Sequence, residues 1–108
     1  MLVHVPLHVR ALGRSTSAEQ VHALLAERYA GEPFVRVRAL NDNSVLANGY
    51  LDAVALNNTN LIELFVYGSS EQLLLTARLD NLGKGASGAA VQNLNLMLGL
   101  PETTGLSI

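Results

Sequence analysis

The sequence predicts an α+β fold, in which a mixed, largely antiparallel sheet carries a helix on one face and a second helix closes the chain. Three observations support this class: alternating apolar residues at the start, an amphipathic helical pattern directly after them, and several β-rich segments before a helical carboxyl end. The length of 108 residues is enough for a single domain with an ordinary apolar core.

The first element is expected to be a strand over residues 3–9. Apolar and polar side chains alternate there, which is typical of a strand with one buried face. Pro6 cannot donate a backbone hydrogen bond, so its presence favours a position at the edge of the sheet. The apolar face would comprise Val3, Val5, Leu7 and Val9.

A helix is expected next, after a connector over residues 13–17. Its start is expected at a capping box, formed either by Thr16 with Glu19 or by Ser17 with Gln20. Gly31 and Pro33 are expected to end it. Its apolar face would comprise Val21, Leu24, Leu25 and Tyr29.

The middle of the chain is expected to be mostly strands. Extended segments are predicted at residues 34–40, 50–56, 61–67 and 72–79, and Asn48-Gly49 is a strong signal for a two-residue hairpin turn. A polar break at residues 57–60 separates two of these strands. A helix from about Ser87 to Leu98 follows, and Gly99 and Pro101 are expected to end it.

Composition excludes several classes of protein. Seven Lys and Arg face nine Asp and Glu, and this net charge of −2 argues against a nucleic-acid partner, which would require clustered basic residues. With no Cys, the chain offers no thiol nucleophile, no disulfide and no cysteine-ligated metal. No apolar run is long enough to span a membrane, and the first residues do not form a signal peptide, so a cytoplasmic protein is expected.

Histidines and arginines offer only weak candidates for a site. His4 and His8 would lie about 13 Å apart on a strand, too far to share a metal ion, and no metal site is expected. His22 is interpreted as a partly exposed residue on the polar side of its helix. Arg36 and Arg38 share one strand face, where they could hold an anionic substrate or simply be solvated.

The segment Gly83-Lys84-Gly85-Ala86-Ser87-Gly88 spells G-x-G-x-x-G between a strand and a helix. A dinucleotide-binding unit would continue to a second parallel strand, and here too few residues follow. A P-loop is excluded because Gly-Lys-Ser/Thr is absent. We expect accessible backbone N–H groups at a helix start, suited to close approach by an anion or by another backbone.

The terminal helix has an unusual composition. No ionisable side chain occurs between Lys84 and Glu102, and apolar residues lie on nearly all sides of the helix. A helix of this kind is usually buried on more than one side, which a domain of this size seldom achieves alone. We therefore expect a partner surface outside this chain.

Residues 79–106 closely resemble the carboxyl end of N-acetyl-gamma-glutamyl-phosphate reductases, which typically reads D-N-L-x-K-G-A-x-G-Q-A-V-Q-N-x-N-L-M-x-G-L-P-E-T-x-G-L. Residues 32–37 and 58–60 are similar to the family's E-P-F-V-R-V and G-S/T-N segments, and Met1-Leu2-Val3 resembles a strand near its catalytic histidine. Two departures are Ala89, where Gln is common, and Asn58, where Gly is common.

The resemblance implies the last third of a longer NADP-dependent enzyme of arginine biosynthesis, which reduces an acyl phosphate to a semialdehyde. The fold would be an incomplete catalytic domain like that of glyceraldehyde-3-phosphate dehydrogenase. Residues 1–79 would belong to the catalytic and oligomerisation domain of a homo-oligomer. Residues 80–108 would pack on a missing amino-terminal domain that binds most of the NADP.

The family's catalytic cysteine and histidine have no counterpart in this sequence, so no catalytic residue is assigned and the chain alone is expected to be inactive. The residues expected to contact the cofactor are Gly85, Ala86, Ser87, Gly88 and Asn93. An equally weighted alternative for Asn93 is a hydrogen bond to the neighbouring domain.

Two other functions remain open at this point. One is the related reductase of lysine biosynthesis, which acts on a carrier-bound aminoadipyl phosphate. The other is a free-standing, non-enzymatic module that dimerises through its apolar terminal helix. An upstream reading frame with a dinucleotide-binding unit and a later Cys would favour an enzyme over the module.

Overall fold

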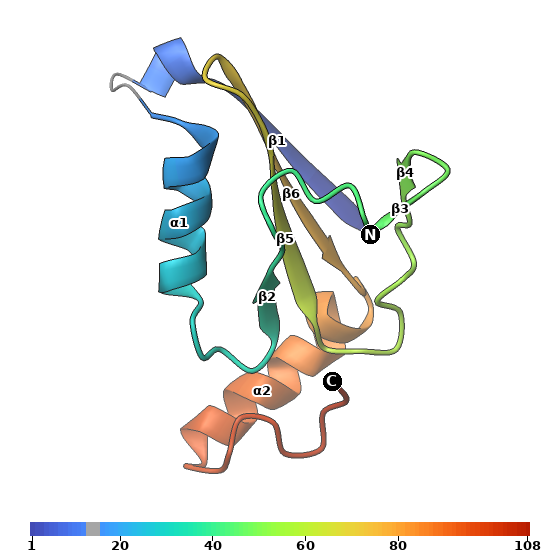
Figure 1. Ribbon diagram of the computed structural model, residues 1–108. Helices are drawn as coiled ribbons and strands as arrows, with labels where there is room; N and C mark the ends of the chain where they lie inside the picture. Colours follow the sequence, from blue (N-terminus) through green and yellow to red (C-terminus); the bar gives the residue numbers. More distant parts are fainter. Residues whose placement is uncertain (13–15) are drawn as a thin grey trace.

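A four-stranded sheet with the order β1-β6-β5-β2 forms the centre of the structure, a computed structural model that describes residues 1–12 and 16–108 (Figure 1). β2 runs parallel to β5, and the other neighbours are antiparallel. The predicted mixed, largely antiparallel sheet is therefore confirmed. The strands are β1 (Leu2–His8), β2 (Val35–Val37), β5 (Ile62–Gly68) and β6 (Gln72–Leu79).

Helix α1 (Ala18–Arg28) lies on one face of this sheet, which we call the helix-covered face (Figure 1). It begins at the capping box of Ser17 and Gln20, so this alternative of the two predicted is confirmed. The core between helix and sheet consists of Val9, Ala18, Val66 and Leu73, with partly buried apolar neighbours around it. Residues 13–15 of the expected connector lie outside the described residues.

β1 is an edge strand, as Pro6 predicted, and it is followed by a short 3-10 helix, Val9–Leu12. Backbone bonds of Leu79 with Met1 and of Val9 with Glu71 fix the alternation along β1. In that alternation Pro6 lies where an N–H group would point away from the sheet, so the proline costs no hydrogen bond and leaves the edge less able to pair.

The helix-covered face is covered only in part, and here two predictions about burial are wrong. Val3 and Val5 are 42% and 45% exposed, because α1 packs over β5 and β2 and leaves this part of β1 uncovered. Leu24, expected on the apolar side of α1, is 65% exposed. Val9 is buried as expected, although it belongs to the 3-10 helix and not to the strand.

A two-stranded hairpin, β3 (Leu46–Ala47) and β4 (Tyr50–Leu51), stands apart from the main sheet (Figure 1). Asn48 and Gly49 have φ values of 52° and 83°, the left-handed conformation that a two-residue hairpin turn requires, so the predicted turn is confirmed. The extended segment predicted over 50–56 is wrong beyond Leu51, because turns follow. The strand predicted over 34–40 is confined to β2.

The terminal helix α2 (Gly88–Met97) lies across one end of the sheet and follows a π-helical turn, Gly83–Ser87 (Figure 1). It ends as predicted: Gly99 has φ 68°, its N–H bonds to Leu96 O, and the N–H of Leu100 bonds to Asn95 O. These two bonds define a Schellman motif. In the described part of the chain, no helix is both long and apolar enough to cross a membrane.

Candidate functional site

The π-helical turn Gly83–Ser87, which we call the glycine turn, lines a hollow of about 470 Å³ at the end of the sheet. Three other segments line it as well: the polar break before β5, Asp80 at the end of β6, and the tail after α2. The lining residues are Asn58, Thr59, Asn60, Asp80, Leu82, Gly83, Ser87, Gly88, Val91, Gly105 and Leu106. This set contains an acidic side chain and no basic one.

Asp80 joins the segments around the hollow. Its Oδ2 accepts the N–H of Asn58 at 2.8 Å, and its Oδ1 accepts the N–H of Leu82 at 3.0 Å. Backbone N–H groups of Asn58, Leu82 and Gly83 lower the pKa of this carboxyl group. Asn58 has φ 65°, a conformation that Asn adopts at little cost, which explains why Asn is tolerated where the family commonly has Gly.

Asn60 attaches the carboxyl-terminal tail. Its backbone N–H and its Nδ2 donate to Ser107 O at 2.9 Å and 3.2 Å. Its Oδ1 is buried and has no hydrogen-bond partner among the described residues. A Cβ at Gly88 would lie 1.7 Å from this oxygen, so α2 begins at a glycine that touches the Asn60 side chain directly.

The glycine turn does not present the free N–H groups that its sequence led us to expect. The N–H groups of Gly85, Ser87 and Gly88 donate to carbonyls of Asp80, Leu82 and Gly83. They are occupied because the turn winds directly into α2 without an open loop. Together with the Asp80 carboxylate, this arrangement does not fit the phosphates of a dinucleotide.

The residues expected to contact a cofactor lie in two different environments. Gly85, Ala86, Ser87 and Asn93 are exposed, whereas Gly88 is buried against Asn60. The exposed side chains of Ser87 and Asn93 could contact a neutral group. The residues of this chain therefore fit a contact at the edge of a cofactor but not its phosphates.

Helix α2 turns polar side chains towards the rest of the chain and most of its large apolar side chains towards solvent. Asn95 is buried and donates to the carbonyls of Glu102 and Thr104, at 3.1 Å and 2.9 Å. Gln92 bridges Lys84 and Glu102, and burial lowers the pKa of the Lys84 amine, which lies 5.0 Å from the centre of the Phe34 ring. The exposed apolar side chains are Val91, Leu94, Leu96, Met97 and Leu98, which we call the α2 stripe.

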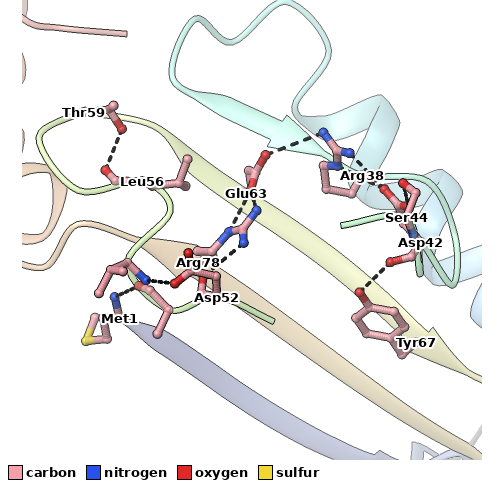
Figure 2. A network of polar contacts seen from close by, with 12 residues as sticks. Met1, Arg38, Asp42, Ser44, Asp52, Leu56, Thr59, Glu63, Tyr67 and Arg78 are labelled. Atoms are coloured by element: carbon pink, nitrogen blue, oxygen red, sulfur yellow. Dashed lines mark hydrogen bonds and ion pairs between the residues drawn. The ribbon is translucent and has the colours of Figure 1, made fainter. Parts of the chain in front are cut away.

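A second polar cluster lies on the face of the sheet opposite α1 (Figure 2). Glu63 accepts the Nε of Arg78 at 2.9 Å and lies 3.6 Å from Arg38, and both Glu63 and Arg78 are buried. Arg38 also pairs with Asp42 at 3.1 Å, so it is not available for the anionic substrate considered above. Arg36 is exposed.

This cluster attaches the segment after β2 to the sheet (Figure 2). The Ser44 hydroxyl donates to the Asp42 carboxylate, and this bond, with smaller contributions from the Ser44 N–H and Arg38, lowers the pKa of the Asp42 carboxyl group. The hydroxyl of Tyr67 donates to Asp42 O at 2.9 Å, and burial raises its pKa, so it stays protonated. Because its charged groups satisfy one another, the cluster acts as structure and offers no free catalytic group.

His22 is partly exposed on its helix, as interpreted from the sequence, and His8 is exposed. His4 Nδ1 lies 2.8 Å from Thr76 Oγ1, and the ring of His22 contacts Arg38 O at 2.9 Å. Among residues 1–12 and 16–108, no three His, Asp or Glu side chains converge in a way that could hold a metal ion.

Sequence reasoning missed the two central residues of the hollow, Asn60 and Asp80, and the buried Glu63–Arg78 pair. Asp80 had a local signal, since an Asp directly before Asn-Leu-Gly is suited to accept the next free N–H groups of a turn. Asn60 belongs to the segment 58–60 that resembles a family motif, but neither Asn60 nor Glu63 had a local signal for its contacts, because their partners lie 47 and 15 residues away.

Residues 1–81 match the family described as semialdehyde dehydrogenase, dimerisation domain. Because this match covers most of the chain, the chain belongs to that family.

The names of similar proteins describe a narrower group than the family description does. The chain is 54% identical to N-acetyl-gamma-glutamyl-phosphate reductase 2 of Nostoc sp., over 98% of this chain and 34% of that protein. It is 49% and 50% identical to N-acetyl-gamma-glutamyl-phosphate reductases of Rhizobium etli and Brucella ovis, over 91% and 92% of this chain and 32% of each relative. The chain thus spans about a third of the length of these relatives, and the resemblance noted from its motifs is confirmed.

Proposed function

We propose that the chain is the carboxyl-terminal part of a cytoplasmic, NADP-dependent reductase that converts N-acetyl-gamma-glutamyl phosphate to its semialdehyde. The observation that supports this most is the 54% identity to the Nostoc reductase along almost the whole chain. In this proposal the nucleophilic Cys, the catalytic His and most of the NADP site belong to the remaining two thirds of the enzyme. The chain supplies no Cys of its own.

Within that enzyme we propose that the chain has two roles. We also propose that it forms part of a catalytic domain resembling that of glyceraldehyde-3-phosphate dehydrogenase. Residues 1–79 belong to the domain that forms the homo-oligomer, in agreement with the family matched by residues 1–81. Residues 80–108 pack on the NADP-binding domain through the α2 stripe. Two facts support this: the stripe is exposed, and it lies outside the matched residues.

For the cofactor, the proposed contribution of this chain is small. Hydride transfer is the chemistry that NADPH supplies, and its phosphates are held elsewhere because the glycine turn does not fit them. Ser87 and Asn93 would contact the edge of the nicotinamide, where an amide side chain can both donate and accept. The backbone of Gly85, Ala86 and Gly88 would hold these two residues in place.

The experiment that tests this function is a chimera. The corresponding third of the Nostoc relative is replaced by residues 1–108, and NADPH-dependent reduction of N-acetyl-gamma-glutamyl phosphate is measured. We expect activity from the chimera and none from this chain alone or from the truncated relative. A folded chimera that is inactive while the intact relative is active would contradict the proposal.

The same chimera tests the contact with the cofactor. Asn93→Ala should raise the KM for NADPH with little change in that for the acyl phosphate, because only the cofactor edge is touched. Glu27→Ala, at an exposed position of α1, is the control. An unchanged KM for NADPH in the Asn93 variant would leave Asn93 with the domain-packing role that was its alternative.

A further inference from the structure

We propose that Asn48 is a site of spontaneous deamidation and that the fold directs this reaction to it. Asn48-Gly49 forms the exposed turn of the β3–β4 hairpin, a motif that the proposed function does not use. Nothing lies within 4 Å of the place where a Cβ of Gly49 would be. The Gly49 N–H is engaged in no hydrogen bond within residues 1–12 and 16–108.

The reaction needs only the chain and water. The backbone nitrogen of Gly49 attacks Cγ of Asn48, the new N–Cγ bond forms, the Cγ–Nδ2 bond breaks, and ammonia leaves after taking up the proton. Water then opens the resulting succinimide at either carbonyl and gives aspartate or isoaspartate. A glycine after the asparagine favours the attack, because no side chain hinders the approach of its nitrogen.

Elsewhere the structure blocks this attack by holding the next backbone N–H. After Asn43, the N–H of Ser44 donates to Asp42 at 3.0 Å, and after Asn57, the N–H of Asn58 donates to Asp80 at 2.8 Å. After Asn58, the N–H of Thr59 donates to Leu56 O at 3.2 Å, and after Asn81, the N–H of Leu82 donates to Asp80 at 3.0 Å. Asn41 is protected differently, since both ends of its side-chain amide bond to the backbone of Gly68.

Deamidation at Asn48 would change the hairpin in two ways. It adds one negative charge to a chain whose net charge is −2. When isoaspartate forms, the backbone gains a carbon, and the two-residue turn that pairs Ala47 with Tyr50 can no longer close in the same geometry. The fraction of chains modified at this exposed position thus increases with the age of the protein.

The test is a time course on the folded chain at mildly alkaline pH. Cleavage after Arg releases peptide 39–78, which contains Asn43, Asn48 and Asn57 and whose ends are unaffected by deamidation or by Asp42→Ala, and tandem mass spectrometry locates a gain of about one dalton. We expect Asn48 to convert at least about tenfold faster than Asn43, because a held N–H reacts only after local opening. Equal rates in the folded chain would overturn the proposal.

Two controls separate structure from sequence. Asp42→Ala releases the Ser44 N–H, so Asn43 should then convert faster; an unchanged Asn43 rate would show that the hydrogen bond does not protect it. In denaturant the protection of Asn43 and Asn57 should be lost while Asn48 remains reactive. If Asn48 instead stays intact in the folded chain and reacts only in denaturant, the turn protects it and the proposal is wrong.

Discussion

At the scale of single residues, Asp80 illustrates how one side chain can hold together the segments around a site. It accepts hydrogen bonds from the loop before β5 and from the start of the glycine turn. These two segments are separated by more than twenty residues in sequence. A carboxylate suits this position because it accepts several backbone N–H bonds at once.

Asp80 should make stability depend on pH at the acid end. Its pKa is lowered from 3.8 by backbone hydrogen bonds, so its contribution is fully present above 3.8 and is lost as the pH falls through the lower folded-state pKa. Asp80→Asn should lower the urea midpoint at neutral pH and flatten the loss of stability in acid. Asp52→Asn, which affects one exposed turn, is the control. Identical acid profiles for wild type and Asp80→Asn would contradict this.

Gly88 should tolerate no side chain. Gly88→Ala places a Cβ 1.7 Å from Asn60 Oδ1 and 2.9 Å from Gly83 O, so α2 or the loop must move. We expect a loss of about 1–3 kcal/mol in the free energy of unfolding, measured by urea titration. Gly85→Ala is the matched control, because its Cβ meets only the exposed, movable side chain of Asn81 and the Asp80 carbonyl at 3.5 Å. Equal stabilities of the two variants would refute the argument.

The Glu63–Arg78 pair should be costly to break from one side. Glu63→Ala leaves the buried guanidinium of Arg78 without its carboxylate, and we expect a loss of about 3–5 kcal/mol in the free energy of unfolding. The exposed Arg28–Glu32 pair provides the comparison, since Arg28→Ala should cost at most about 0.5 kcal/mol.

A double variant tests the cause. Glu63→Leu with Arg78→Met removes both charges, and it should recover most of the stability lost in Glu63→Ala. If the double variant is as unstable as the single one, packing and not the unpaired charge determines the loss. Urea titration of the wild type, Glu63→Ala, the double variant and Arg28→Ala measures the differences in the free energy of unfolding.

At the scale of elements, the sequence predicted those whose signals are local. β6 has the predicted bounds, α1 begins at a predicted capping box, and the Asn48-Gly49 turn has the expected left-handed conformations. The end of α2 at Gly99 is equally local, because a glycine in that conformation is what the motif requires.

Elements whose contacts leave no recognised sequence signal were predicted less well, even where those contacts are local. β2 is shorter than its apolar pattern suggested, although Arg38 N still bonds to Leu64 O. Residues 52–56 turn, since Asp52 accepts the N–H of Val54. The glycine turn looked open because G-x-G-x-x-G implies no specific partner for its N–H groups. The structure supplies Asp80, Leu82 and Gly83 carbonyls, which no spacing rule indicated.

At the scale of the whole molecule, its main property is an excess of exposed apolar surface. The α2 stripe is outside, and Val3 and Val5 add to it on the uncovered part of the sheet. Fully burying one Leu or Met side chain is worth roughly 1.5–3 kcal/mol, so several such residues rival the stability of a small domain. Association with another surface is the expected response.

The isolated chain should therefore associate in solution. We expect a dimer or larger species by light scattering, and Leu94→Glu with Met97→Glu should shift it towards monomer, because these side chains are 51% and 83% exposed. Ala23→Glu, on an exposed site of α1, is the control. A monomeric wild-type chain at about 100 μM would rule out any association tighter than that.

The outward-facing stripe also has a consequence for the life of the polypeptide in a cell. Residues 94–100 read Leu-Asn-Leu-Met-Leu-Gly-Leu, with no charge. Until this surface is covered, it is the kind of segment that chaperones and proteases recognise and that aggregates when crowded. A chain of this sequence separated from its assembly partner would thus be short-lived, so its cellular abundance would follow the supply of that partner more closely than its own rate of synthesis.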